Sequence, residues 1–124
     1  MLNSQLWIEP LGNVVVVRVR GELTESLLKE IHERVIQLLR DTEYTRVLYD
    51  ALEMESPDID IALLQEKLNE KTKQLFADQS LRKAILVSNT RLGYLSRIAF
   101  GQFGEGDYRV FYNDLSHALQ WLET

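Results

Sequence analysis

The most constraining feature of the sequence is the run Val14–Leu23, which reads V-V-V-V-R-V-R-G-E-L. Its odd-numbered valines alternate onto one face of an extended strand, and its even-numbered positions are apolar until Arg18 and Arg20. A strand that is apolar on both faces is normally buried between two layers, and β-branched valines suit a pleated sheet. The run therefore predicts an interior strand that stops at Gly21, with Thr24 placed to cap the next helix.

Hydrophobic spacing along the rest of the chain predicts an α/β fold with the element order β-β-α-β-α-β-α-β-α. The expected strands are Gln5–Glu9, Val14–Arg20, Arg46–Tyr49, Ala84–Val87 and Arg109–Tyr112. The expected helices are Thr24–Asp41, 57–76, Arg91–Phe103 and a last helix capped by Asn113 or Asp114. The residues of the last helix that we expect to face inward are Leu115, Ala118, Leu119 and Leu122.

The connections predict how these elements are arranged. Pro10–Asn13 contains residues typical of turns, so the first two strands should form an antiparallel hairpin. The later strand–helix–strand units should be right-handed parallel crossovers. We therefore expect a mixed, mostly parallel five-stranded sheet with four helices and with both faces covered. The 124 residues contain no Pro- or Gly-rich linker, which predicts a single domain over residues 1–124.

Composition excludes several classes of function. The net charge of −5 argues against general nucleic-acid binding, and the absence of Cys excludes disulfides, thiolate zinc sites and a thiol nucleophile. No segment has the roughly 20 apolar residues that a membrane helix needs, so membrane insertion is not expected. The first residues show no basic region followed by a long apolar run, as a signal peptide would. These features are compatible with a cytoplasmic protein.

Motifs for catalysis are missing as well. The sequence has no Gly-x-Gly-x-x-Gly after a strand, no phosphate-binding lysine loop and no Gly-x-Ser-x-Gly elbow. His32 and His117 have no histidine four residues away, which argues against a helical metal site. We therefore predict that the protein is not an enzyme and carries no cofactor or metal.

The segment after the third expected strand is rich in acidic residues. These are Asp50, Glu53, Glu55, Asp58 and Asp60. Oxygen ligands of this kind can hold Mg²⁺, but a solvated loop leading into a helix N-terminus is the favoured interpretation. Ser56-Pro57 predicts a helix start, with Ser56 as the N-cap.

Two further groups of residues are candidate contact sites. Asn89, Thr90 and Arg91 begin a helix at the carboxyl end of a parallel strand, where an anion can bind, although an ordinary N-cap is the favoured interpretation. On the following helix, helical spacing puts Gly93, Arg97 and Phe100 on the outward side. These three residues are a candidate protein interface, for which a homodimer is the commonest form.

Two stretches carry a resemblance to a known family. The Val-rich strand that runs through Gly21 into Thr24 resembles the corresponding part of STAS domains, the bacterial anti-sigma-factor antagonists. The ending Tyr108–Leu115, followed by Ala118, Trp121 and Leu122, is similar to that of the SpoIIAA-like (STAS/CRAL-TRIO-like) family. The element order agrees along almost the whole chain.

This resemblance implies a non-catalytic regulatory module with a protein partner. The antagonists carry a phosphorylatable Ser, preceded by Asp and followed by Gly, in the loop after the third strand. Here the corresponding residues are Glu55-Ser56-Pro57, so the acidic residue and the Ser are present and the Gly is replaced by Pro. The resemblance points to Asp50, Glu53, Glu55 and Ser56 as a regulatory loop. The alternative is a binding domain for an apolar small molecule or lipid held between a helix and the sheet.

Overall fold

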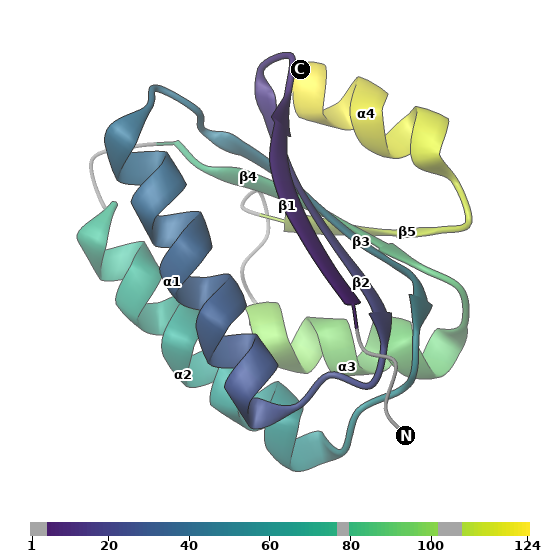
Figure 1. The fold of residues 1–124 in the computed structure, drawn as a ribbon. Helices are drawn as coiled ribbons and strands as arrows, with labels where there is room; N and C mark the ends of the chain where they lie inside the picture. The colour runs from purple at the N-terminus through teal and green to yellow at the C-terminus, as the bar shows by residue number, and fades with distance from the viewer. Residues whose placement is uncertain (1–4, 77–79, 102–107) are drawn as a thin grey trace.

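The structure is a computed structural model that describes residues 5–76, 80–101 and 108–124. It confirms the predicted order of strands and helices (Figure 1). The strands are β1 (Gln5–Leu11), β2 (Val14–Gly21), β3 (Arg46–Met54), β4 (Arg82–Val87) and β5 (Tyr108–Tyr112). The helices are α1 (Glu25–Asp41), α2 (Ile59–Leu75), α3 (Thr90–Phe100) and α4 (Leu115–Glu123).

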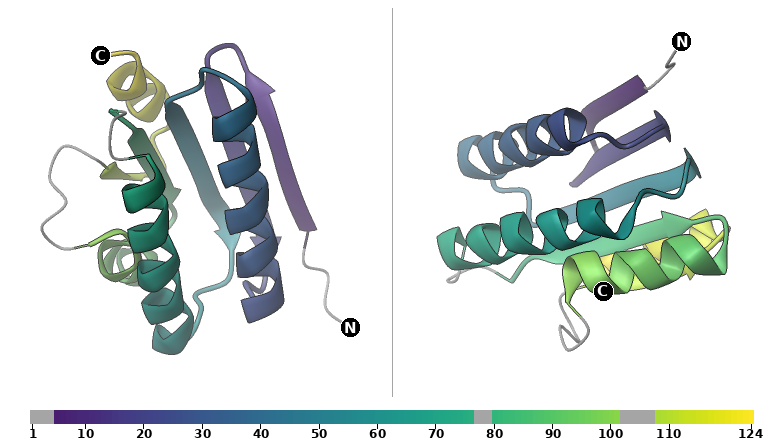
Figure 2. Two further views of the ribbon diagram at one scale, coloured as in Figure 1. Left: turned by 90° about the vertical axis from the view of Figure 1, so that its left-hand side faces the viewer. Right: turned by 90° about the horizontal axis from the view of Figure 1, so that it is seen from below.

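The sheet is mixed and has the strand order β1-β2-β3-β4-β5. β1 is antiparallel to β2, and all later neighbours are parallel, as predicted. Because each crossover steps to the next strand in the same direction and with the same hand, α1, α2 and α3 lie on one face. α4 lies alone on the other face (Figures 1 and 2). Both faces of the sheet are therefore covered, one by three helices and the other by α4 alone.

The core between β2 and α1 forms as the sequence predicts. Val15 and Val17 are 0% and 1% exposed and pack against the apolar stripe of α1. The buried residues of that stripe are Leu28, Ile31, Val35 and Leu39. The helix begins where Thr24 Oγ1 accepts a hydrogen bond from the Leu27 amide at 3.1 Å, which confirms Thr24 as its N-cap.

The hairpin turn is tighter than predicted. Leu11 pairs with Val14, so only Gly12 and Asn13 form the turn, and Pro10 is a strand residue opposite Val15. Gly12 has a φ of 63°, which glycine adopts without strain. Pro10 is tolerated because β1 is an edge strand, where a missing N–H need not break the ladder.

Several helix ends differ from the predictions. α2 begins at Ile59 with Asp58 as the N-cap, so the expectation that Ser56 caps this helix is wrong. α3 ends at Phe100, before Gly101 at a φ of 94°, and the predicted helical positions 102 and 103 lie outside the described residues. Leu115, expected to face inward, is 47% exposed, because it is the first residue of α4.

The first two helices share a polar contact inside the three-helix layer. Thr72 of α2 is 4% exposed, and its hydroxyl lies 3.4 Å from Nδ1 of His32 on α1. Thr72 Oγ1 also donates to the Leu68 carbonyl at 3.2 Å. Desolvation, followed by the nearby charges of Lys83 and Lys71, lowers the pKa of His32, against a weaker opposite effect of Glu33.

This lowered pKa predicts a loss of stability in mild acid. The unfolded chain takes up a proton on His32 near pH 6.5, whereas the folded protein does so only at lower pH. The unfolded state thus binds more protons in that window, so the free energy of unfolding should fall as the pH falls from about 7.5 to about 5.5. Urea unfolding at both pH values measures this. His32→Gln should reduce the acid-side loss, and His117→Gln, on the exposed side of α4, should retain it. Equal losses in wild type and His32→Gln would contradict the assignment.

The far end of α4 is held by two arginines. Arg46 Nε donates to the Leu122 carbonyl at 2.8 Å, and Arg82 Nη1 donates to the Trp121 carbonyl at 3.2 Å. The Arg82 guanidinium also lies over the Trp121 ring, 5.2 Å from its centroid. The last carbonyls of a helix lack partners inside the helix and carry partial negative charge, so both arginines stabilise this end.

Candidate functional site

A β-bulge brings four charged side chains together at the carboxyl end of β2 and β3. In the strand register Arg18 lies opposite Asp50, but Arg20 lies opposite Glu53. β3 therefore contains one more residue than β2 between these two positions. The Leu52 amide donates to Asp50 Oδ1 at 3.1 Å across the bulge. Side chains normally alternate along a strand, so without the extra residue Asp50 and Glu53 would point to opposite faces. The third strand, expected over Arg46–Tyr49, therefore continues to Met54, so the expectation of a solvated loop directly after Tyr49 is wrong for this part.

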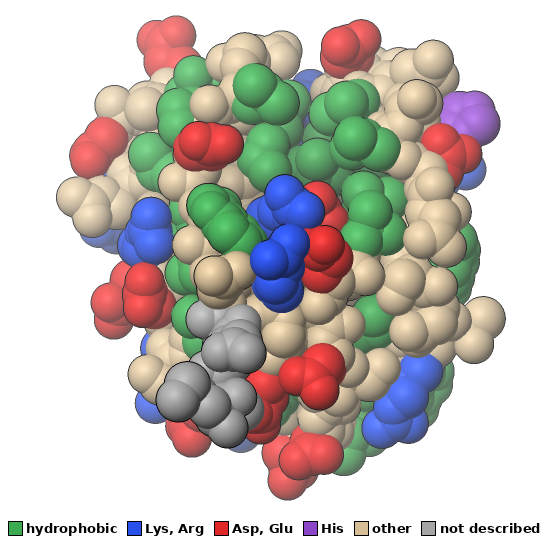
Figure 3. All heavy atoms as spheres, turned by 45° about the vertical axis from the view of Figure 1, so that its right-hand side comes forward, with side chains coloured by type: hydrophobic (Ala, Val, Ile, Leu, Met, Phe, Trp, Pro, Cys, Tyr) green, Lys and Arg blue, Asp and Glu red, His purple; other side chains and the backbone are tan. Residues whose placement is uncertain are grey.

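The four side chains form a compact ion-pair network on the α4 side of the sheet. Arg20 binds Glu53 through two contacts, Nε to Oε2 at 2.9 Å and Nη2 to Oε1 at 3.2 Å. Arg18 reaches the same carboxylate at 3.0 Å and Asp50 Oδ2 at 3.8 Å. The hydrogen bond from Arg20 lowers the pKa of Glu53, and the bound carboxylate raises the pKa of Arg20. Figure 3 shows basic and acidic side chains together in the middle of this face, with hydrophobic side chains around them.

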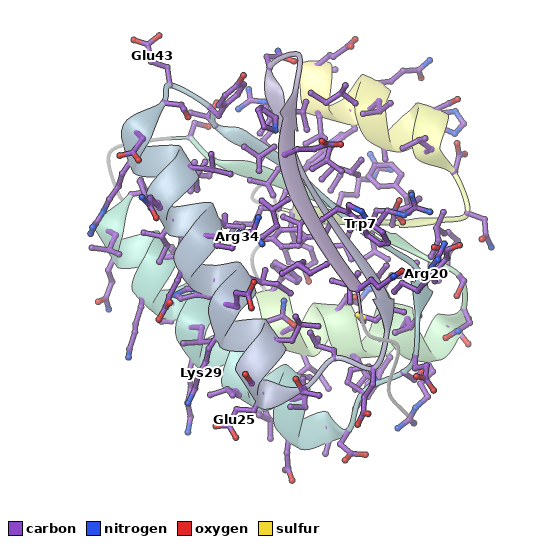
Figure 4. All side chains as sticks on the ribbon, in the orientation of Figure 1. Trp7, Arg20, Glu25, Lys29, Arg34 and Glu43 are labelled. Carbon is purple, nitrogen blue, oxygen red and sulfur yellow. The ribbon has the colours of Figure 1, made fainter. Side chains whose placement is uncertain are left out.

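Trp7 of β1 completes this network. The Arg18 and Arg20 guanidiniums lie 5.5 Å and 5.7 Å from the Trp7 ring centroid. The ring is nevertheless 40% exposed, and Figure 4 shows Trp7 and Arg20 on the same side of the sheet as α4. We call Trp7, Arg18, Arg20, Asp50 and Glu53 the Trp7 cluster. Both guanidiniums are paired with Glu53 inside the cluster, although as exposed pairs they add little stability.

The segment that follows the cluster presents Ser56 to solvent. The Glu55 amide donates to the Gly21 carbonyl at 2.9 Å, which holds the start of the segment against the end of β2. Ser56 is exposed, and within the described part of the chain its hydroxyl makes no hydrogen bond. Glu55, Asp58 and Asp60 are exposed as well. In the described residues no three His, Asp or Glu side chains are grouped so that they could hold a metal ion.

The structure places the predicted anion contact at the start of α3. Asn89 Oδ1 accepts a hydrogen bond from the Leu92 amide at 2.9 Å, which confirms the N-cap interpretation of this residue. Thr90 and Arg91 are exposed in the first turn. Anion binding at this helix start stays a prediction.

The expected interface on α3 is not an outward surface. Phe100 is half-buried between Tyr49 and Tyr108, whose ring centroids lie 5.2 Å and 5.7 Å away. Gly93 is buried, and any side chain there would collide with the Tyr112 ring. Only Arg97 is exposed, and its Nη1 donates to the Tyr112 hydroxyl at 3.2 Å. This correction arises because α3 packs against both α2 and the sheet, so two of its sides are buried.

The comparisons with known proteins agree with the fold. The family model named SpoIIAA-like matches residues 14–123. The chain belongs to the SpoIIAA-like family. A sequence comparison with curated proteins finds no significant match. Among the described residues, no helix is both long enough and apolar enough to cross a bilayer.

Solved structures show the same SpoIIAA-like fold. The anti-sigma factor antagonist SpoIIAA in its unphosphorylated form superposes with a TM-score of 0.71 at 12% identity, over 96% of each chain. An anti-sigma factor antagonist from Mycobacterium paratuberculosis has a TM-score of 0.70 at 13% identity, over 98% of this chain and 96% of that one. An uncharacterised protein from Shewanella loihica with a SpoIIAA-like fold has a TM-score of 0.66 at 22% identity, over 98% and 95%. At these identities the similarity establishes the fold.

Proposed function

We propose that the protein is a non-catalytic regulatory module that binds a protein partner at the carboxyl end of β2 and β3. The observation that carries this proposal is the exposed Trp7 ring, which two paired arginines hold in place. Tryptophan and arginine are the side chains most often found to dominate binding energy at protein interfaces. A surface ordered in advance also loses less conformational entropy when a partner binds.

The regulatory part of the proposal is phosphorylation of Ser56, which would change the binding of the partner. Ser56 lies three residues after Glu53 of the Trp7 cluster, and it is exposed without a capping role. A phosphate would add about −1.5 to −2 charges at pH 7 beside Glu55, Asp58 and Asp60. The sequence has no Lys or Arg between Arg46 and Lys67 to offset this charge locally. Two structures with this fold are anti-sigma factor antagonists, one of them solved in an unphosphorylated form, which supports a protein partner and a phosphate-dependent state.

The Ser56 proposal predicts that a negative charge changes association without changing stability. Because the Ser56 hydroxyl is exposed and caps no helix, Ser56→Ala and Ser56→Asp should each alter the free energy of unfolding by less than about 0.5 kcal/mol. Partners captured from a lysate of the source cells are identified, purified and titrated against each variant. We expect Ser56→Ala to bind normally and Ser56→Asp to bind at least about tenfold more weakly.

Ser116 on α4 provides the matched control, since it is also an exposed serine. Ser116→Asp should leave association unchanged. Trp7→Ala should weaken association with the same partner, because it removes the ring at the centre of the proposed surface. A partner whose affinity is the same for wild type, Ser56→Asp and Trp7→Ala would show that binding occurs elsewhere.

The alternative of an apolar small molecule receives less support. The groove that the structure describes between α4 and β5 has a volume of about 530 Å³, which is large enough for a small ligand. Its lining includes Arg109, Asp114 and His117, so it favours an occupant with polar groups.

A further inference from the structure

The groove between β5 and α4 has a geometry that the proposed function does not use. Its lining includes Arg109, Val110, Phe111 and Tyr112, four consecutive residues of β5. Successive side chains of a strand point to opposite faces, and the side chains of Val110 and Tyr112 lie on the α3 side, so these two residues line the groove through their backbone. β5 is the last strand of the sheet, which leaves its outer edge without a neighbouring strand among the described residues.

α4 forms the wall of the groove. The chain reverses after β5 at Asn113, which has a positive φ of 53°, and α4 runs back beside β5 (Figure 1). His117, Gln120 and Trp121 of α4 line the groove. A helix of this length spans about 13 Å and a five-residue strand about 17 Å, so wall and edge have similar lengths. α4 packs over β3 and β4, through Leu48, Ala84 and Leu86, and so leaves the outer edge of β5 open to an added peptide strand among the described residues.

The charged and aromatic residues of the groove indicate what such a peptide would carry. The Arg109 guanidinium lies 5.6 Å from the Phe111 ring centroid, and among the described residues it has no carboxylate at ion-pair distance. Phe111 and Trp121 face each other at a centroid distance of 6.1 Å. His117 is held by a hydrogen bond to Asp114, which lowers the pKa of that carboxyl. The groove thus offers a cation beside an aromatic pair.

We propose that this groove binds an extended peptide segment of another protein, which adds a strand to β5. The peptide places an acidic side chain at Arg109 and an apolar side chain against Phe111 and Trp121. Half of the β5 backbone groups are directed away from β4, and these supply main-chain hydrogen bonds that do not depend on the peptide sequence. The groove lies at β5 and the Trp7 cluster on β1, β2 and β3, and no residue belongs to both, so the two surfaces are tested separately.

The probe for this proposal is a displayed library of random linear peptides of about ten residues, longer than a typical strand. Selection on the wild-type protein should enrich peptides that combine an acidic residue with apolar residues at alternate positions. Synthetic copies of enriched peptides should shift the amide resonances of Arg109–Tyr112 and slow hydrogen exchange there. The resonances of the segment between β3 and α2 should not move.

Matched variants test the position of the peptide. Gln120→Trp fills the groove and Arg109→Glu reverses its charge, so each should weaken binding at least about tenfold. Ser116→Trp places the same bulky group on α4 outside the groove lining and should leave the dissociation constant within about twofold of wild type. All three positions are exposed, and a melting temperature confirms that each variant is folded.

Four results would overturn the proposal. They are a library without enrichment, peptides that bind Gln120→Trp as well as wild type, resonance shifts confined to the segment between β3 and α2, and a protein that dimerises through β5 and hides the groove. Loss of the Ser56 effect would refute only the proposed function, because no residue of the groove takes part in that test.

Discussion

Val17→Asp is expected to prevent folding. Val17 is 1% exposed, and it faces α1 from a strand that has neighbours on both sides. An ionised carboxylate has no partner there, and its desolvation costs several kcal/mol in addition to the lost apolar contacts. Domains of this size are stable by only about 5–15 kcal/mol, so one such change is enough to unfold the chain. Soluble yield and the dispersion of amide resonances measure the outcome.

Val16→Asp is the matched control for this prediction. Val16 is the preceding residue, and it points to the half-covered face, where it is only partly buried. An aspartate at this position can reach water, so the variant should fold with reduced stability. If both variants fold equally well, β2 is not the interior strand that the core requires.

The fold was largely predictable because the spacing of apolar residues distinguishes strands from helices: every second residue in the valine run, and every third or fourth residue in the helical stripes. Val15, Val17 and Val19 could only pack as one buried strand face, and Thr24 could only cap the helix that follows. The failures occur where tertiary contacts decide. Leu115 matches the helical stripe but lies at the first turn of α4, and Phe100 looks outward only if α3 buries a single side.

The start of α2 shows why a local signal can mislead. Ser56-Pro57 fits an N-cap followed by the first helical residue, but a Pro also suits the extended segment before a helix. Asp58 has extended backbone angles, φ −68° and ψ 156°, and α2 begins only after it. The sequence therefore locates Ser56 correctly in the segment before α2, but the predicted N-cap role belongs to Asp58.

The Trp7 cluster was accessible to sequence reasoning only in part. A hairpin with the observed two-residue turn places Trp7 opposite Arg18, and that pairing can be counted from the sequence. A four-residue turn over Pro10–Asn13 gives a different register, in which Trp7 is not opposite Arg18. The bulge in β3 has no comparable signal in the sequence, so nothing indicated that Asp50 and Glu53 would both face the arginines.

α4 supports the second large expected effect. Leu122 is 1% exposed and packs with Ala118 against the α4 side of the sheet. Leu122→Ala should lower the free energy of unfolding by about 2–5 kcal/mol, since it removes buried methyl groups and leaves a cavity that the sheet cannot fill. The carbonyl of the same residue accepts the hydrogen bond from Arg46, so loosening of this turn also strains that contact. Chemical denaturation measured by circular dichroism gives the change.

Leu115→Ala provides the control on the same helix. Leu115 is 47% exposed, so the same substitution should change the free energy of unfolding by less than about 0.5 kcal/mol. Leu119→Ala should fall between the two, because Leu119 is only partly buried. This order of stability losses is expected because α4 packs against the sheet mainly through its C-terminal half. Arg46 and Arg82 donate hydrogen bonds to its last carbonyls there. Equal losses for Leu115→Ala and Leu122→Ala would mean that α4 packs along its whole length instead.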